Sequence, residues 1–149
     1  METPTTTTPA EATALDAYIK LMRAADAVTA RAHTVLPKGL TIPQFAVLEV
    51  LFHRGSLCQS EIAAKVLKSA GNLTLVVDNL ERDGHVTRQR DPEDRRFVTV
   101  SLTPQGRAFI SELFPQVAAA ITREFSALTA AEQTTLAELC KKAGRAAAD

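Results

Sequence analysis

The residues best suited to chemistry lie in one charged stretch, "DPEDRRFVTVSLTPQG" at 91–106. Its first six residues hold three acids and two arginines, Arg95 and Arg96. Paired arginines suit an anionic partner, because a guanidinium is planar, always charged and weakly hydrated. The acids occupy a turn, and a flexible turn does not hold the geometry that acid–base catalysis needs. The stretch therefore indicates anion recognition rather than catalysis.

Elsewhere the sequence offers no set of residues that would suit an enzyme or a metal centre. It contains no Ser/His/Asp arrangement on plausible elements and no phosphate-binding loop. The histidines are far apart in the sequence, at His33, His53 and His85, and two cysteines, Cys58 and Cys140, cannot form a disulfide framework. We expect no catalytic site, no cofactor and no metal ion.

The balance of charge restricts how the chain could bind a polyanion. Lys and Arg together number 17, as do Asp and Glu, so bulk charge alone cannot attract nucleic acid and basic groups must be placed locally. No apolar run approaches the roughly 18 residues of a membrane span. The N-terminus also lacks the basic and apolar regions of a secretory signal. We expect one soluble, cytoplasmic protein with no membrane partner.

Helical periodicity dominates the first half of the chain. Apolar residues at three- and four-residue spacing predict a long helix from Ala12 to about Leu36, after a Thr/Pro-rich arm at 1–11 that we expect to be disordered. A second helix begins after Thr41, which has Gln at capping-box spacing. Further helices are predicted at 60–68 and from about Ser69 to Gly84.

The period then changes from 3.6 to 2. Residues 85–90 and 96–102 alternate between apolar and polar, and the Asp-Pro-Glu-Asp between them supplies turn residues, so a β-hairpin is expected. Three short helices followed by a two-stranded hairpin are the winged form of the helix-turn-helix. The predicted fold class is mainly α with a small β-hairpin wing.

Two further helices follow the hairpin. The first begins at Thr103-Pro104 and should be kinked at Pro115, and the second runs from Thr129 to about Gly144. The helices at the two ends of the chain are too apolar to stand alone, so they are expected to bury one another across a two-fold axis in a homodimer. The expected organisation is a disordered arm at 1–11, an N-terminal dimerisation helix at 12–37, a winged helix-turn-helix domain at 38–103 and C-terminal dimerisation helices at 104–149.

The fourth predicted helix has one apolar and one polar face. At about 100° per residue, an apolar sector is expected to face the core, and the opposite face is small and polar in its first turn. Such a surface suits the major groove, where hydroxyl and amide groups contact base edges or phosphates and Leu75 could contact a thymine methyl. The alternative is that Ser69 is only a cap and the polar face only solvated. The candidate DNA contacts are Lys68, Ser69, Gly71, Asn72, Thr74 and Leu75.

Over about residues 12–144 the chain resembles the MarR (multiple antibiotic resistance regulator) family of bacterial winged-helix repressors. The resemblance implies an obligate homodimer whose first, fifth and sixth helices intertwine. It implies a double-stranded DNA operator as the partner of that dimer. It also implies that the fourth helix enters the major groove and the wing reaches the minor groove. The most specific motif is an Asp-x-Arg followed by Val-x-Leu-Thr, which here comprises Asp94, Arg96, Val100, Leu102 and Thr103.

The resemblance also assigns roles within the wing. It makes Arg96 the minor-groove arginine and Asp94 the acid that orients it, with Arg95 as a neighbouring backbone contact. Arg88 and Arg90 flank the base of the wing. The chemistry agrees, because a guanidinium suits a narrow, negative minor groove and a pre-fixed rotamer loses less entropy on binding.

Two modes of regulation follow from the resemblance. Many members release DNA on binding small phenolic or lipophilic anions, for which Tyr18, Arg31 and His33 are candidate pocket residues; the alternative is that these side chains are structural. Other members sense oxidants through cysteine. Cys58 stands where the family usually has Thr or Ser as the cap of the third helix. A redox sensor acting through Cys58 is therefore the alternative function. In the structural interpretation, Cys58 is only an inert, partly buried thiol.

Overall fold

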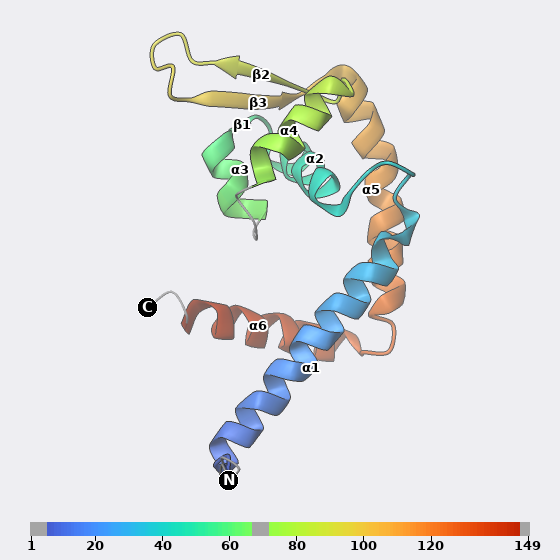
Figure 1. Cartoon of the computed structure of the whole chain (residues 1–149). Helices are drawn as coiled ribbons and strands as arrows, with labels where there is room; N and C mark the ends of the chain where they lie inside the picture. The colour runs from blue at the N-terminus through green and yellow to red at the C-terminus, as the bar shows by residue number, and fades with distance from the viewer. Residues whose placement is uncertain (1–5, 67–71, 147–149) are drawn as a thin grey trace, which may run out of the picture. The chain divides into compact units, whose positions relative to one another are not determined.

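The computed structural model describes residues 6–66 and 72–146, which form a mainly helical chain with a small antiparallel sheet (Figure 1). This architecture confirms the predicted winged fold class. Contacts divide the chain into two compact units: the winged-helix unit, residues 35–119, and the outer-helix unit, residues 1–34 with 120–149. In chain order the elements are α1 (Pro9–Ala32), the short 3₁₀ helix η1 (His33–Val35), α2 (Ile42–Arg54), β1 (Leu57–Cys58), α3 (Gln59–Val66), α4 (Leu73–Arg82), β2 (Val86–Arg90), β3 (Val98–Leu102), α5 (Pro104–Glu124) and α6 (Ala130–Ala146).

The winged-helix unit is built around one apolar core. Its helices α2 to α5 each contribute one apolar side, and the sheet contributes one residue from β2 and one from β3. Full burial of one such aliphatic side chain stabilises the fold by about 1.5–3 kcal/mol, so the core outweighs any single polar contact. The buried members are Phe45, Val47, Leu48, Leu51, Ile62, Leu73, Val77, Leu80, Val86, Val100, Ile110, Leu113 and Val117.

The wing is a three-stranded sheet rather than an isolated hairpin. Its strand order is β1-β3-β2, and both pairings are antiparallel. Figure 1 shows β2 and β3 side by side, joined by a loop at one end. The register pairs Arg90 with Val98 next to that loop and Leu57 of β1 with Val100. The sequence predicts only two strands, because two residues of β1 are too few for alternation to be visible.

A glycine ends α4 as the sequence predicts. Gly84 has a φ of 82°, a left-handed conformation that L-residues with a side chain rarely adopt. Its N–H donates to the carbonyl of Glu81 at 3.0 Å, and the N–H of His85 donates to the carbonyl of Leu80 at 2.9 Å. These two bonds satisfy carbonyls at the helix end and turn the chain directly into β2.

The start of α5 is tied to that same turn. Thr103 caps α5, since its Oγ1 accepts from the N–H of Gly106 at 2.9 Å. The Thr103 hydroxyl donates to the carbonyl of Gly84 at 2.6 Å, and the Thr103 N–H donates to the carbonyl of His85 at 3.0 Å. Gly106 is buried against the carbonyl of His85. A Cβ built on Gly106 would lie 1.9 Å from that carbonyl oxygen, so only glycine fits there. The wing therefore joins α5 by backbone contact.

The first helix begins earlier than the sequence analysis expects, so the predicted disorder through residue 11 is wrong for its last residues. Thr8 is the N-cap: its hydroxyl accepts from the N–H of Glu11 at 3.1 Å, and the Glu11 carboxylate accepts from the N–H of Thr8 at 2.7 Å. Pro9 occupies the first turn, where its missing N–H has no cost. α1 then ends at Ala32 and is followed by η1, short of the predicted end.

The C-terminal helices also differ in part from expectation. The border between the compact units lies at 119/120 inside α5, not at the predicted 103/104, because α5 packs into the winged-helix core as far as Val117. α5 continues through Pro115, and the expected kink stays a prediction. The capping box of α6 is confirmed, with Thr129 and Glu132 exchanging hydrogen bonds of 2.9 and 3.1 Å. Gly144 does not end α6, because its backbone stays helical to Ala146.

The outer-helix unit leaves many large apolar side chains exposed in the single chain. They lie along α1 and α6. Across residues 6–66 and 72–146, no helix combines the length and the apolar character that crossing a lipid bilayer requires. The exposed set includes Leu15, Tyr18, Ile19, Leu21, Met22, Leu136 and Leu139.

Candidate nucleic-acid interface

The exposed face of α4 carries the described part of the predicted recognition surface. Thr74 is exposed and Leu75 is 58% exposed, while Leu73 packs inward, so the predicted division of the helix into two faces is confirmed. Asn72 is the N-cap, and its side chain makes no capping hydrogen bond. The described helix runs from Leu73, and its predicted start near Ser69 lies outside the described residues. Of the other predicted contacts, Lys68, Ser69 and Gly71 lie outside the described residues.

A side chain that the sequence analysis did not single out holds Thr74. Gln59, the first residue of α3, donates from Nε2 to Oγ1 of Thr74 at 2.9 Å. This bond links the first helix of the helix-turn-helix to the exposed face of the second. No local sequence signal predicts it, because the two residues lie 15 positions apart and only the packing of α3 and α4 brings them together.

The acids of α4 are neutralised from within the fold. Arg88, on β2, forms ion pairs with Asp78 and, at 3.2 Å, with Glu81. Hydrogen bonds from the Arg88 side chain, and then from its backbone N–H, lower the pKa of the Glu81 carboxyl. The Arg88 side chain is only 24% exposed, so it is committed to joining α4 to β2. Its predicted contact with DNA stays a prediction.

The loop at the tip of the wing is held by its own first residue. The Asp91 carboxylate accepts from the N–H of Glu93 at 2.8 Å and of Asp94 at 3.4 Å. The Asp91 N–H donates to the carbonyl of Phe97 at 3.0 Å, and the Phe97 N–H donates to the carbonyl of Asp94 at 3.1 Å. This closed pattern gives the tip a defined backbone, as expected of an Asx-type turn.

Asp94 binds Arg96 with the geometry that the sequence motif predicts. Nε and Nη2 of Arg96 donate to the two carboxylate oxygens of Asp94 at 3.0 and 2.9 Å, and the Arg96 N–H donates at 3.1 Å. The side-chain hydrogen bonds from Arg96 lower the pKa of Asp94, so it stays ionised. A guanidinium has five N–H donors, so three remain for another partner. The Arg96 side chain is 88% exposed, and these donors therefore face solvent.

The remaining wing residues are also exposed. Arg90 and Arg95 are both exposed, as a contact to DNA requires. Phe97 follows Arg96 and is 50% exposed, a large apolar group at the tip that the sequence analysis did not single out. Beneath the hairpin, a pocket of about 260 Å³ is lined by Gln59, Glu81, Arg88, Arg90 and Val98.

The three predicted effector residues do not converge within one chain. Tyr18 is 59% exposed on α1, and Arg31 lies 13 residues further along the helix, about 20 Å at 1.5 Å per residue. Arg31 pairs with Glu124 of α5 at 2.6 Å, within the outer-helix unit. Nδ1 of His33 lies 2.7 Å from the carbonyl oxygen of Thr29. Their role in effector binding stays a prediction.

Cys58 lies at the start of α3, as predicted, and is half-buried. Its N–H donates to the carboxylate of Glu61 at 3.1 Å, which is one half of a capping box, and its Sγ lies 3.1 Å from the Ser60 hydroxyl. Cys140 is exposed on α6 in the single chain. A redox function of Cys58 stays a prediction.

Comparison with known proteins identifies the family. A model described as the MarR family matches residues 40–98. The HTH-type transcriptional regulator YkoM of Bacillus subtilis is 42% identical over 106 residues, which cover 71% of this chain and 69% of that protein. MhqR, another HTH-type transcriptional regulator of B. subtilis, is 34% identical over 131 residues, covering 87% and 90%.

A solved structure agrees with these sequence relatives. BpsR of Bordetella bronchiseptica, whose DNA binding is regulated by 6-hydroxynicotinic acid, is 28% identical to this chain. The match has a TM-score of 0.80 and covers 87% of this chain and 98% of that one. The chain belongs to the MarR family of DNA-binding, helix-turn-helix transcriptional regulators.

Proposed function

We propose that this protein is a homodimeric repressor of a pseudo-palindromic operator, with α4 in the major groove and Arg96 in the minor groove. We further propose that a small aromatic or lipophilic anion releases it from DNA. The observation that carries the proposal is the Asp94–Arg96 pair, in which an exposed guanidinium is fixed in advance and keeps three donors for DNA.

The charge distribution around α4 supports this mode of binding. Arg88 offsets two acids that would otherwise repel phosphate, and the first turn of α4 presents small polar groups on Asn72 and Thr74. A helix N-terminus favours phosphate because its free N–H groups point outward. A chain with zero net charge can therefore bind DNA through local basic groups.

The dimer is supported by the apolar side chains that a single chain leaves exposed on α1 and α6. A contiguous exposed apolar surface is typical of a protein interface. Two subunits related by a two-fold axis would place two α4 helices in half-sites about one helical turn apart. The mass in solution checks this, since a subunit has a mass of 16.0 kDa and a species of that mass would reject the dimer.

The effector class rests on similarity. BpsR responds to 6-hydroxynicotinic acid, an aromatic anion. We propose a ligand of the same chemical kind for this chain. A dimer bound to an operator that overlaps a promoter would repress transcription by blocking access to the promoter.

The direct test is operator binding by an Arg96→Ala variant. An operator is first selected from random duplexes with the parent protein, and affinities are then measured by fluorescence anisotropy at one fixed salt concentration. Loss of a minor-groove arginine should weaken specific binding by about 5-fold to 150-fold. Unchanged operator affinity would reject the wing assignment.

Two variants make the test specific to the preorganised pair. Asp94→Asn keeps the charge of Arg96 but removes one charged acceptor, so a smaller loss than that of Arg96→Ala is expected. Arg95→Ala removes the same charge from the neighbouring position and serves as the matched control. If Arg95→Ala weakens binding as much as Arg96→Ala, net charge rather than placement explains the effect.

A further inference from the structure

The hydrogen bond between Gln59 and Thr74 has a fixed direction. Nε2 of Gln59 donates to Oγ1 of Thr74 at 2.9 Å. A threonine hydroxyl has two acceptor lone pairs and one proton, and a primary amide has two N–H donors. The bond therefore fills one lone pair of Thr74. It leaves the hydroxyl proton and the second N–H of Gln59 to be donated to another partner.

Gln59 also lines the pocket beneath the hairpin. This pocket, of about 260 Å³, lies between the start of α3, the last turn of α4 and the strands β2 and β3. Its volume is enough for a phosphodiester group, because one molecule of liquid water takes only about 30 Å³. The side chain of Gln59 thus connects the exposed face of α4, at Thr74, with the space between α4 and the wing.

Arg90 carries the available positive charge of this pocket. The Glu81 carboxylate accepts from the N–H of Arg88 at 3.0 Å and from its guanidinium at 3.2 Å. The same guanidinium pairs with Asp78, so the charge of Arg88 is already balanced within the fold. Arg90 is exposed, and no carboxylate of the described residues lies within 4.0 Å of its guanidinium.

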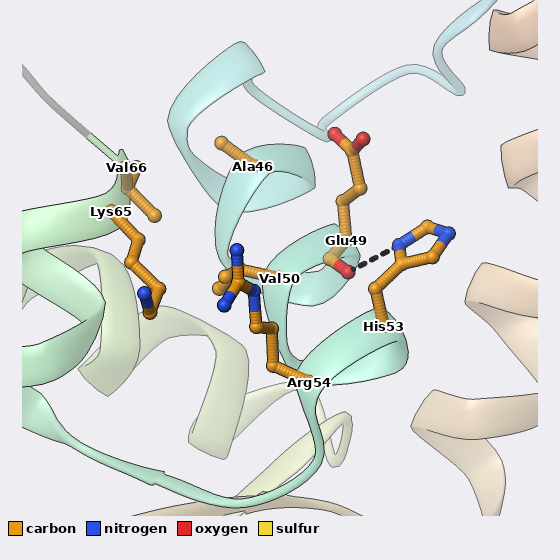
Figure 2. Close-up of a pocket in the computed structure, with 7 residues that line it drawn as sticks. All are labelled: Ala46, Glu49, Val50, His53, Arg54, Lys65 and Val66. Carbon is orange, nitrogen blue, oxygen red and sulfur yellow. Dashed lines mark hydrogen bonds between the residues drawn. The ribbon is translucent and has the colours of Figure 1, made fainter.

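A second pocket of the winged-helix unit lies between α2 and α3 (Figure 2). Its volume is about 310 Å³, and it shares no lining residue with the pocket beneath the hairpin. Arg54 lines it, and Figure 2 shows this side chain extending alongside Val50 of α2. Arg54 is exposed like Arg90 but lies outside α4 and the wing, so it provides a matched control.

The proposed placement of the protein on DNA brings a phosphate to the pocket beneath the hairpin. With α4 in the major groove and Arg96 in the minor groove, the sugar-phosphate strand that separates these grooves must cross between α4 and the wing. A phosphodiester offers only hydrogen-bond acceptors and one negative charge. These match the remaining donors of Gln59 and Thr74 and the charge of Arg90. Threonine, glutamine and arginine are all common phosphate ligands.

We propose that Gln59, together with Thr74 and Arg90, binds one backbone phosphate in each half-site of the operator. This inference rests on the proposed function, and it adds Gln59 to the residues that contact DNA. It also assigns Thr74 to the backbone rather than to a base edge. Thr74 therefore fixes the position of α4 on the duplex without reading its sequence.

Substitutions at this phosphate site should weaken binding to all DNA alike. The affinities of Gln59→Leu, Thr74→Val and Arg90→Gln are measured by fluorescence anisotropy on the selected operator and on a mixed-sequence duplex of equal length. Each variant should lose at least about fivefold on both duplexes, the effect of one hydrogen bond to a charged group. Arg90→Gln should also reduce the slope of log K against log salt by about 1 for each half-site. A loss confined to the operator would mean that these residues read bases, and it would overturn the proposal.

Control variants separate the phosphate site from general effects. Arg54→Gln removes an equivalent charge, and Gln116→Leu removes an amide on α5 that donates to the Glu112 carbonyl at 3.4 Å, so both should keep the parent's affinity. Circular dichroism checks that Gln59→Leu folds. If it does not, Gln59→Glu takes its place. A glutamate can only accept from Thr74 and would repel the phosphate, so this variant should lose more than about fivefold.

Methylphosphonate linkages, which are neutral, identify the phosphate. One is placed in turn at each backbone position of the operator half-site. At one position the linkage should weaken binding by the parent, and Gln59→Leu should cause little further loss there because the contact is already gone. Additive losses at every position would overturn the proposal.

The outcomes distinguish this proposal from the proposed function. Parental affinity of Gln59→Leu for both duplexes, with a loss of operator binding in Arg96→Ala, would overturn only the phosphate site. Parental affinity of Arg96→Ala, with an equal loss on both duplexes in Gln59→Leu, would reject the wing assignment and support Gln59 as a phosphate contact. If the parent selects no operator, the proposed repressor is rejected, and the mixed-sequence duplex still decides whether Gln59 contacts DNA.

Discussion

Gly106→Ala should destabilise the protein, although alanine is the better helix former. Gly106 lies in the first turn of α5, and its backbone packs on the His85 carbonyl where α4 turns into β2. A Cβ at this position would lie 1.9 Å from that oxygen and 2.8 Å from the carbonyl carbon. Both distances are below any stable contact. The backbone of the turn or of α5 therefore has to move.

The magnitude follows from three contributions. Replacing glycine by alanine within a helix gains about 1 kcal/mol. Forcing a methyl group into a closed space costs about 1–3 kcal/mol, and the shift weakens the hydrogen bonds of Thr103 to the Gly84 and His85 carbonyls, at about 1 kcal/mol each. The balance is a net destabilisation of about 2–4 kcal/mol.

Urea unfolding at matched protein concentration measures this difference. Gly144→Ala in α6 is the control, because within the described residues of the chain nothing lies within 4 Å of a Cβ built there. That variant should be as stable as the parent or up to about 1 kcal/mol more stable. A Gly106→Ala protein with parental stability and an unchanged m-value would refute the close-packing argument.

Two further predictions concern the ion pairs. Arg88→Met should lower the free energy of unfolding by about 1 kcal/mol or less, since the ion pair with Asp78 is partly exposed. A double-mutant cycle with Asp78→Asn should give a positive coupling energy. A coupling energy of zero would mean that the pair does not contribute to stability. Hydrogen bonds from Arg96 lower the pKa of Asp94, and a hydrogen bond from the N–H of Thr129 lowers the pKa of Glu132. Both carboxylates therefore stabilise the fold at pH values above their unfolded pKa. This contribution is lost as the pH falls through the folded pKa. Thermal stability should therefore decline below about pH 4.5, and Glu132→Gln, which can still cap α6, should show a shallower decline; an identical pH profile would contradict this.

The sequence by itself determines features that depend on neighbours a few residues apart. The capping boxes at the starts of α2 and α6 are such features, and so is the end of α4 at Gly84. The two faces of α4 follow from its 3.6-residue period, and the Asp94–Arg96 pair needs only a two-residue spacing. A local hydrogen bond or a helical stripe is visible in the sequence because its partners are close along the chain.

Local spacing also misleads where the local signal is weak. The Thr/Pro-rich start was expected to be disordered, yet Thr8 and Glu11 form a capping box that begins α1 at Pro9. Gly144 was expected to end α6, but a single glycine costs only about 1 kcal/mol in a helix and α6 continues past it.

Only the tertiary structure decides which distant residues meet. Packing of α3 on α4 brings Gln59 to Thr74, and the path of β2 beneath α4 assigns Arg88 to Asp78. The same packing adds β1 to the sheet, draws α5 into the winged-helix core as far as Val117 and opens the pocket between α2 and α3. These contacts join segments many residues apart, and their energy comes from burial of the common core. Sequence spacing does not encode them, because only the folded core sets the distance between such segments.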